Sequence, residues 1–138
     1  MKQVSVFVEN RPGSLMEVTS KLMEAEINIR AVASFDTPEF GILRLVVDNP
    51  QKAKEALTKL GFVVRIYDVV GVELKDEKGN LNRMLSILAE SRINLNYIYS
   101  FVIRDNNAPV MVFSTDDMEG AEKLLSEAGV KLVSDEEL

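Results

Sequence analysis

The fold is decided by a stretch that occurs twice, as VSVFVENRPGSLMEVTSKLMEAEINIRAVASF at residues 4–35 and as VGVELKDEKGNLNRMLSILAESRINLNYIYSF at residues 70–101. At this offset of 66 positions, 11 of the 32 aligned residues are identical. Unrelated sequences of average composition would match at about two positions. The chain is therefore a tandem duplication, and we expect one domain at 1–68 and a second at 69–138.

Each half predicts the same series of strands and helices. Residues 4–8 alternate apolar with polar side chains, which indicates a half-buried strand, and a turn sequence follows at 10–14. Leu15, Val18 and Leu22 then fall at helical spacing. The first half continues with strands at 28–35 and 41–47, a helix from Pro50 and a strand at 62–67. The second half predicts strands at 69–75, 94–103, 109–114 and 130–133, with helices at 81–91 and 116–128.

The order β-α-β-β-α-β, repeated twice, predicts an α+β fold. Right-handed crossovers place both helices of a unit on one face of its sheet. Each half is therefore expected to form a ferredoxin-like unit, with an antiparallel sheet and helices on one face.

Several residues are predicted to begin helices or to form turns. Ser14 is a predicted N-cap, and Glu17 stands three residues later, as a capping box requires. Asn80 and Asp116 are predicted N-caps in the second half. Turns between strands are expected at 36–39 and 104–108.

Composition excludes several classes of protein. The chain has no Cys and no His, so it lacks a thiol nucleophile, a disulfide framework and the commonest general base and metal ligand. We therefore expect no metal and no cofactor. The net charge of −6 argues against a generic nucleic-acid or anionic-membrane surface. No apolar run is long enough to span a membrane and no signal peptide is evident, so a cytoplasmic protein is expected.

The turn from the first strand into the first helix is the expected ligand site of each half. Gly13 and Gly79 stand there, and glycine permits both positive φ and close approach of a ligand. The helix N-terminus behind each glycine suits a carboxylate. Asn10 and Asn28 offer donor and acceptor atoms, which together suit a zwitterionic amino acid. Taken singly, these residues are also explained by ordinary turn chemistry.

The segment Glu9–Leu15, followed by Ile27-Asn28-Ile29, resembles the ACT domain, especially that of phosphoglycerate dehydrogenases with their Asn-Arg-Pro-Gly loop. The resemblance covers nearly the whole chain. It implies a regulatory module that binds amino acids or similar metabolites at interfaces between paired ACT units. In serine-sensing members the loop Asn and the Asn opening the second strand hold the ligand, which implies such roles for Asn10 and Asn28. Those members carry a His where this chain has Val8, a departure that bears on whether serine is the ligand.

The candidate ligand-binding residues of the first half are Asn10, Arg11, Pro12, Gly13, Ser14, Leu15 and Asn28. Those of the second half are Asp76, Gly79, Asn80, Leu81 and Asn94. The first site is expected to bind more tightly, because Pro12 limits the freedom of its loop. The second loop has Lys78 in place of that proline, and burying the charges of Asp76 and Lys78 is unfavourable unless the ligand pairs with both.

The leading hypothesis is a non-catalytic regulatory protein that binds an amino acid or related metabolite and controls a separate metabolic enzyme. Apolar edge strands such as 29–35 favour a homodimer or higher oligomer. One alternative is a structural interaction module without a ligand. Another is a small acylphosphatase-like enzyme, since acylphosphatase shares the topology and Arg11 and Asn28 are of the required types. The acylphosphatase signature is absent, however.

Overall fold

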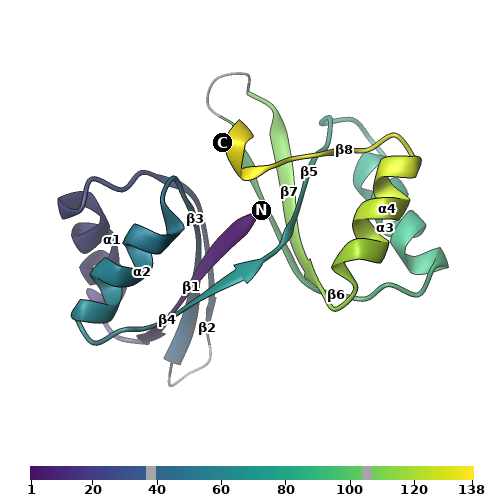
Figure 1. The fold of residues 1–138 in the computed structure, drawn as a ribbon. Coiled ribbons are helices and arrows are strands. Elements are labelled where there is room, and N and C mark those ends of the chain that lie inside the picture. Colours follow the sequence, from purple (N-terminus) through teal and green to yellow (C-terminus); the bar gives the residue numbers. More distant parts are fainter. Residues whose placement is uncertain (37–39, 104–106) are drawn as a thin grey trace. The chain divides into compact units, whose positions relative to one another are not determined.

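The computed structural model describes residues 1–36, 40–103 and 107–138. These residues form two compact units, Lys2–Tyr67 and Asp68–Leu138, and the second unit also includes Met1 (Figure 1). The carbonyl of Met1 accepts a hydrogen bond from Val69 N at 2.9 Å, which attaches this residue to the second unit.

The first unit has the predicted β-α-β-β-α-β order. Its elements are β1 (Lys2–Glu9), α1 (Ser14–Glu24), β2 (Ile29–Asp36), β3 (Phe40–Val47), α2 (Pro50–Lys59) and β4 (Val63–Asp68). The sheet runs β2-β3-β1-β4, and β3 pairs antiparallel with both β1 and β2. Helices α1 and α2 lie together against one face of the sheet (Figure 1).

The second unit repeats this architecture and confirms the predicted tandem ferredoxin-like fold. Its elements are β5 (Val70–Glu73), α3 (Asn80–Glu90), β6 (Leu95–Val102), β7 (Pro109–Thr115), α4 (Met118–Glu127), β8 (Lys131–Leu132) and the 3-10 turn Asp135–Glu137. The sheet order β6-β7-β5-β8 is equivalent to that of the first unit. Strand β8 has only two residues, whereas its counterpart β4 has six.

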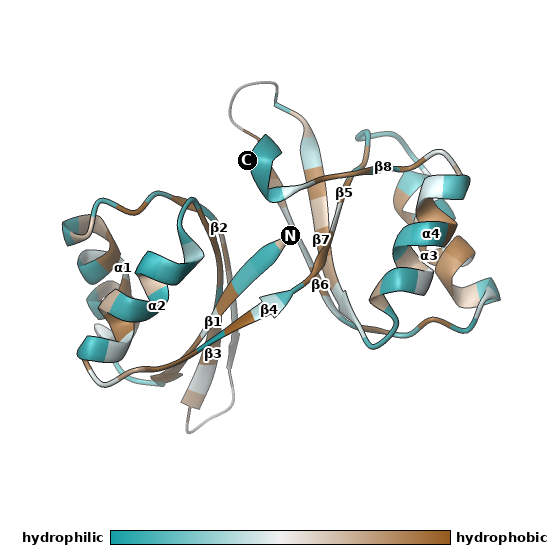
Figure 2. Cartoon of the chain, in the orientation of Figure 1, coloured by the Kyte–Doolittle hydropathy of each residue, from teal (hydrophilic) through white to brown (hydrophobic). Residues whose placement is uncertain are grey.

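Each unit has its own hydrophobic core between helices and sheet. In the first, Val6 of β1 pairs with Leu43 of β3, and both pack beneath Leu22 of α1 and Leu57 of α2. Figure 2 shows the matching pattern, with hydrophobic stretches along the strands and mixed colours around the helices. Burying such a side chain contributes about 1.5–3 kcal/mol relative to leaving it exposed. The alternation seen in the sequence therefore selects which face of the sheet carries the helices.

Helix termini differ from the sequence prediction by one residue. Asp117, not Asp116, caps α4, and its side chain accepts a hydrogen bond from Gly120 N at 3.0 Å. Asp116 instead accepts a hydrogen bond from the Asn96 side chain at 3.2 Å. The prediction was wrong because either aspartate fits the cap by residue type. Strand β7 ends at Thr115, so Asp116 still belongs to the connection and the helix begins one residue later than expected. The predicted turns fall partly at 37–39 and 104–106, which lie outside the described residues.

Candidate functional site

The loop from β1 into α1 turns at Gly13, which has φ 86° and is the N-cap of the helix. Glycine adopts this left-handed conformation without steric strain. No side-chain hydrogen bond caps α1, so the predicted capping box of Ser14 and Glu17 is wrong. Gly13 completes the turn one residue earlier than expected, which makes Ser14 the first helical residue. The Ser14 Oγ is buried and has no hydrogen-bond partner among the described residues.

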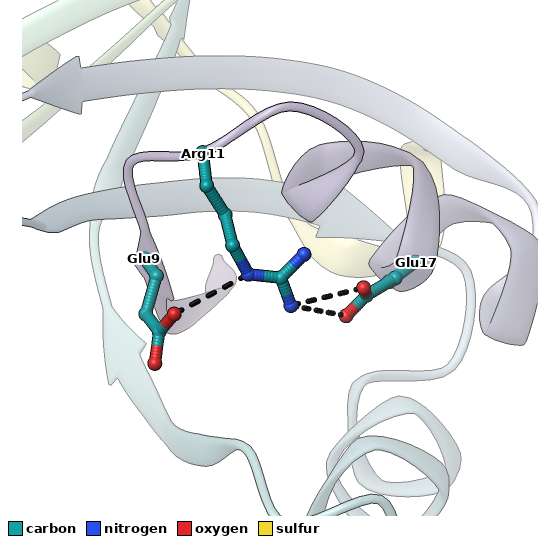
Figure 3. Close-up of polar contacts among 3 residues, drawn as sticks. All are labelled: Glu9, Arg11 and Glu17. Carbon is teal, nitrogen blue, oxygen red and sulfur yellow. Dashed lines mark hydrogen bonds and ion pairs between the residues drawn. The ribbon is translucent and has the colours of Figure 1, made fainter.

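Arg11 links the two ends of this loop through carboxylates on either side (Figure 3). Its Nε donates to Glu9 Oε2 at 3.3 Å, and its Nη2 donates to Oε1 and Oε2 of Glu17 at 3.0 and 3.3 Å. The hydrogen bond and charge of Glu17, followed by those of Glu9, raise the pKa of Arg11. Because the Arg11 side chain is 49% exposed, solvent screens the network and its contribution to stability is small.

The equivalent loop of the second unit turns at Gly79, which has φ 88° and is the N-cap of α3. The prediction that Asn80 is the N-cap is therefore wrong, for the same reason as at Ser14. Asn80 is the first helical residue, and its Nδ2 donates to the carbonyl of Lys75 at 3.0 Å. This bond closes the loop between Lys75, just beyond the end of β5, and the start of α3, whereas Ser14 makes no such bond.

The ligand-binding residues predicted in the first unit fall into two groups. Asn10, Pro12 and Leu15 are exposed around the β1–α1 loop. Asn28 lies beyond the other end of α1, where its backbone N–H donates to Asp48 Oδ1 at 3.1 Å. Helix α1 has 11 residues. A helix of this length is about 16 Å long. The loop and Asn28 are therefore not neighbours within the unit.

The second unit separates its predicted residues in the same way. Asp76 and Leu81 are exposed at the β5–α3 loop, and Asn94 is exposed just before β6. Helix α3, also of 11 residues, lies between them. Each unit therefore carries two groups of predicted residues, one at either end of its first helix, and Asn28 is half-buried whereas Asn94 is exposed.

A cavity of about 570 Å³, which we call the first cavity, opens beside the β1–α1 loop of the first unit. Its walls are the end of β1, one side of α1 from Ser14 to Glu24, and the segment Leu60–Val63 that leads into β4. Of the predicted residues only Arg11 and Ser14 line it. Sequence reasoning missed the wall at 60–63, because it concentrated on the first half of each repeat.

The second cavity, of about 460 Å³, occupies the equivalent place in the second unit. It is lined by Glu73, Asn80 and Arg83 among others, and by the segment Gly129–Lys131 before and within β8. The Nη2 atom of Arg83 donates to the carbonyl of Ala128 at 3.2 Å, at the end of α4. The guanidinium of Arg83 thus provides a hydrogen bond to a carbonyl at the C-terminus of α4.

Lys131 forms ion pairs beside the second cavity. Its Nζ lies 3.1 Å from Glu73 Oε2 and 3.5 Å from Glu137 Oε2. The hydrogen bond and charge of Glu73, and then the charge of Glu137, raise the pKa of Lys131. These contacts join β8, β5 and the C-terminal 3-10 turn.

No group of three or more acidic side chains within 1–36, 40–103 and 107–138 is placed to hold a metal ion. None of the helices in the same ranges is both long and apolar enough to cross a membrane.

The comparisons with known proteins agree with this architecture. The model of the ACT domain pair matches residues 1–138, and the chain belongs to that family. A crystal structure of protein BT0572 from Bacteroides thetaiotaomicron is 36% identical, with a TM-score of 0.91 over 99% of this chain and 93% of that one. The ligand-free regulatory subunit of aspartate kinase from Thermus thermophilus is 20% identical, with a TM-score of 0.65 over 92% of this chain and 91% of that one. No curated protein matches.

Proposed function

We propose that the protein is a non-catalytic regulatory protein that binds an amino acid or related small metabolite through its ACT domains and controls a separate metabolic enzyme. The observation that carries the proposal is the pair of glycine-capped loops, at φ 86° and 88°, in a chain matched throughout by the ACT domain pair. The regulatory subunit of aspartate kinase, which has a related fold, is named as a subunit of an enzyme. We propose that the protein performs this regulation in the cytoplasm.

The chemistry of the groups at the two ends of α1 supports a zwitterionic ligand. The N-terminus of α1 carries N–H groups without intrahelical acceptors and a partial positive charge, which suit a carboxylate. The amides of Asn10 and Asn28 suit an ammonium group through their oxygens. The ligand itself needs no His, Cys or metal.

We propose that the complete site forms between two copies of the chain. One α1 separates the loop from Asn28, so a small ligand reaches both only where the loop of one copy meets Asn28 of another. The edge strand β2 and the exposed Leu15, Met23 and Val32 offer an apolar surface for such pairing. We expect a homodimer or a higher oligomer. Light scattering that gives only a 15.4 kDa particle at high concentration would refute this expectation.

Calorimetric titration with the twenty amino acids, aromatic acids and branched-chain keto acids tests the ligand proposal. Asn28→Ala is expected to weaken binding by about 1–3 kcal/mol, because a ligand hydrogen bond is lost. The backbone of Asn28, not its side chain, contacts Asp48, so the variant keeps that contact. Gly13→Val is expected to abolish binding by obstructing the loop. Asn94→Ala and Gly79→Val are the matched controls in the second unit.

These titrations also locate the tighter site. We expect it in the first unit, where Pro12 restricts the loop. If affinity is unchanged in both first-unit variants and lost in the second-unit ones, the tighter site lies in the second unit. If none of the compounds binds at millimolar concentration, the chain is an interaction module without a ligand.

A further inference from the structure

The second sheet carries buried apolar side chains on the face turned away from its helices. Met111 and Phe113 of β7 pack against the core beneath α3 and α4. Side chains alternate along a strand, so Val110 and Val112, which are fully buried, lie on the opposite face. We call the residues buried on this face the helix-free cluster: Val69, Ile103, Ala108, Val110, Val112 and Val133. An apolar face of this kind needs a cover that excludes water.

The segment 134–138 contacts the helix-free cluster. Leu138 is half-buried and packs against the cluster, as does Met1. The three acidic residues of the 3-10 turn, Asp135–Glu137, are exposed. Figure 2 shows this turn in the colour of polar residues. The segment thus presents an apolar side chain to the cluster and acidic side chains to water.

The backbone bonds and the ion pair of this segment are local or exposed to water. Just before it, Val133 N donates to the carbonyl of Gly71 in the sheet at 2.8 Å. The N–H groups of Glu137 and Leu138 instead donate to carbonyls within the segment, at 3.1 and 3.4 Å. Glu137 Oε2 lies 3.5 Å from Lys131 Nζ, and their side chains are 40% and 58% exposed, so water screens the pair. The segment can therefore leave the sheet without breaking a strand ladder.

The equivalent face of the first sheet is polar where that of the second is apolar. Val112 pairs with Gly71 in the second sheet, and the equivalent pair in the first is Arg44 with Ser5. After β4 the chain of the first unit continues directly into β5, whereas β8 of the second unit is followed by the turn that contacts the cluster. The covering segment thus belongs to the unit whose helix-free face is apolar.

From these observations we propose that residues 134–138 form a displaceable strap over the helix-free cluster. In the closed form the strap gives this face an acidic surface, and in the open form the apolar side chains of the cluster are exposed. Exposure of apolar surface disfavours the open form, and the weak anchors keep it populated as a minor state. The strap does not depend on the proposed amino-acid site, because none of its residues lines the second cavity.

Methyl relaxation dispersion on the full chain, measured by nuclear magnetic resonance, tests for the open form. This method detects minor states that exchange in microseconds to milliseconds. We expect exchange at the methyl groups of Leu138, Val110 and Val133, and none at Val72 and Leu125 in the core on the helix side of the sheet. Exchange of equal size on both faces, or static methyl groups in the helix-free cluster, overturns the proposal.

Two variants of the full chain test the anchors through binding of the dye 8-anilinonaphthalene-1-sulfonate, which reports exposed apolar surface. Leu138→Ala is expected to raise dye binding by about fivefold to tenfold, because part of the favourable burial of a leucine is lost. Glu137→Gln is expected to raise it by up to about fivefold, the range for one exposed ion pair.

Each of these variants has a matched control that should leave dye binding unchanged. Glu136→Gln makes the same change in net charge on the same turn. Val102→Ala removes apolar atoms from an exposed residue of β6, which lies on the helix side because Ile98, four residues earlier on the strand, packs there. Unchanged dye binding in Leu138→Ala, or equal increases in the controls, overturns the proposal.

Discussion

The two β–α loops have almost the same backbone and opposite charges. Gly13 and Gly79 cap their helices at φ 86° and 88°. Around them, each charged residue of the first loop is replaced 66 positions later by one of opposite sign, as Glu9 by Lys75, Arg11 by Glu77 and Glu17 by Arg83. The fold thus retains the turn while the side chains around it reverse the local field.

The cavity walls differ as sharply as the loops. Phe7 and Val63 are among the residues that line the first cavity, whereas the equivalent residues of the second, Glu73 and Lys131, form an ion pair at 3.1 Å. The comparison teaches that the duplicated backbone provides two similar hollows, and that side chains alone decide what each accepts. A ligand assigned to one unit therefore cannot be transferred to the other by symmetry.

The largest loss of stability is expected from substitutions in the two hydrophobic cores, where the units are most alike. Leu22 and Leu88 are equivalent, and each is at most 1% exposed within its own core. Leu22→Ala and Leu88→Ala should each destabilise the chain by about 2–5 kcal/mol, because each leaves a cavity. Urea unfolding followed by circular dichroism measures both. A loss near zero in either variant would contradict the equivalence of the two cores.

A smaller effect is expected at the helix-capping glycines. Gly13→Val and Gly79→Val should each destabilise the protein by about 1–2 kcal/mol, the usual strain of a side chain in a left-handed conformation. A Cβ built at either position meets no atom within 4 Å, so backbone strain is the main cause. Gly13→Asn and Gly79→Asn are the controls and should lose less, because Asn tolerates this conformation. Equal losses for Val and Asn would point to a cause other than strain.

Replacing the first residue of α1 and of α3 by alanine is expected to change the stability of the chain in opposite directions. Asn80→Ala should destabilise by about 0.5–1.5 kcal/mol, because the bond to the Lys75 carbonyl is lost. Ser14→Ala should be neutral or stabilising, because it removes a buried hydroxyl without a partner and Ala favours helix. Thermal unfolding of both variants measures the difference. A clear loss in Ser14→Ala would show that its hydroxyl has a partner in solution.

The smallest effect is expected at Lys131, which is well exposed. Its pKa is raised in the folded chain, chiefly by Glu73. A raised lysine pKa stabilises the folded state below the unfolded pKa, and this contribution disappears as pH rises through the folded pKa. The slight advantage of the wild-type chain over Lys131→Gln should therefore persist at neutral pH and vanish at alkaline pH. Melting temperatures measured across the alkaline range check this, and Lys123→Gln on α4 provides a control in the same unit. An advantage that grows with pH would contradict the assignment.

The fold was predictable because its signals are local and repeated. Alternating valines from Val4 to Val8 mark a half-buried strand, and the 66-residue offset shows that the same unit occurs twice. The position of helix caps was not predictable in the same way. Ser14 and Asn80 are good N-caps by type, but each follows a glycine that completes the turn first. A residue type indicates what can cap a helix, whereas backbone geometry decides which residue does.

The candidate site was predictable only in part. The loop glycines were identified from the sequence as turn residues, and both have the positive φ that the turn requires. The cavity beside Phe7 was not found, because its other wall lies more than 50 residues away at Leu60–Val63. A signal did exist: Gly61 and Gly129 both have positive φ and stand 68 positions apart, two more than the offset of the first halves. Aligning the second halves at that spacing places Val63 opposite Lys131.

The exchange of Phe7 and Val63 for Glu73 and Lys131 also bears on how the two halves diverged after duplication. Phe7 and Val63 are 41% and 53% exposed, and the Lys131 side chain is 58% exposed. A single change at such a surface position, to a charge without its partner, has little effect on folding because water solvates the charge. The lysine at 131 could therefore arise before its partner, whereas the side chain of Glu73 is only 28% exposed and depends more on the ion pair. The outer position of this pair was thus open to gradual change in a way that the buried leucines were not.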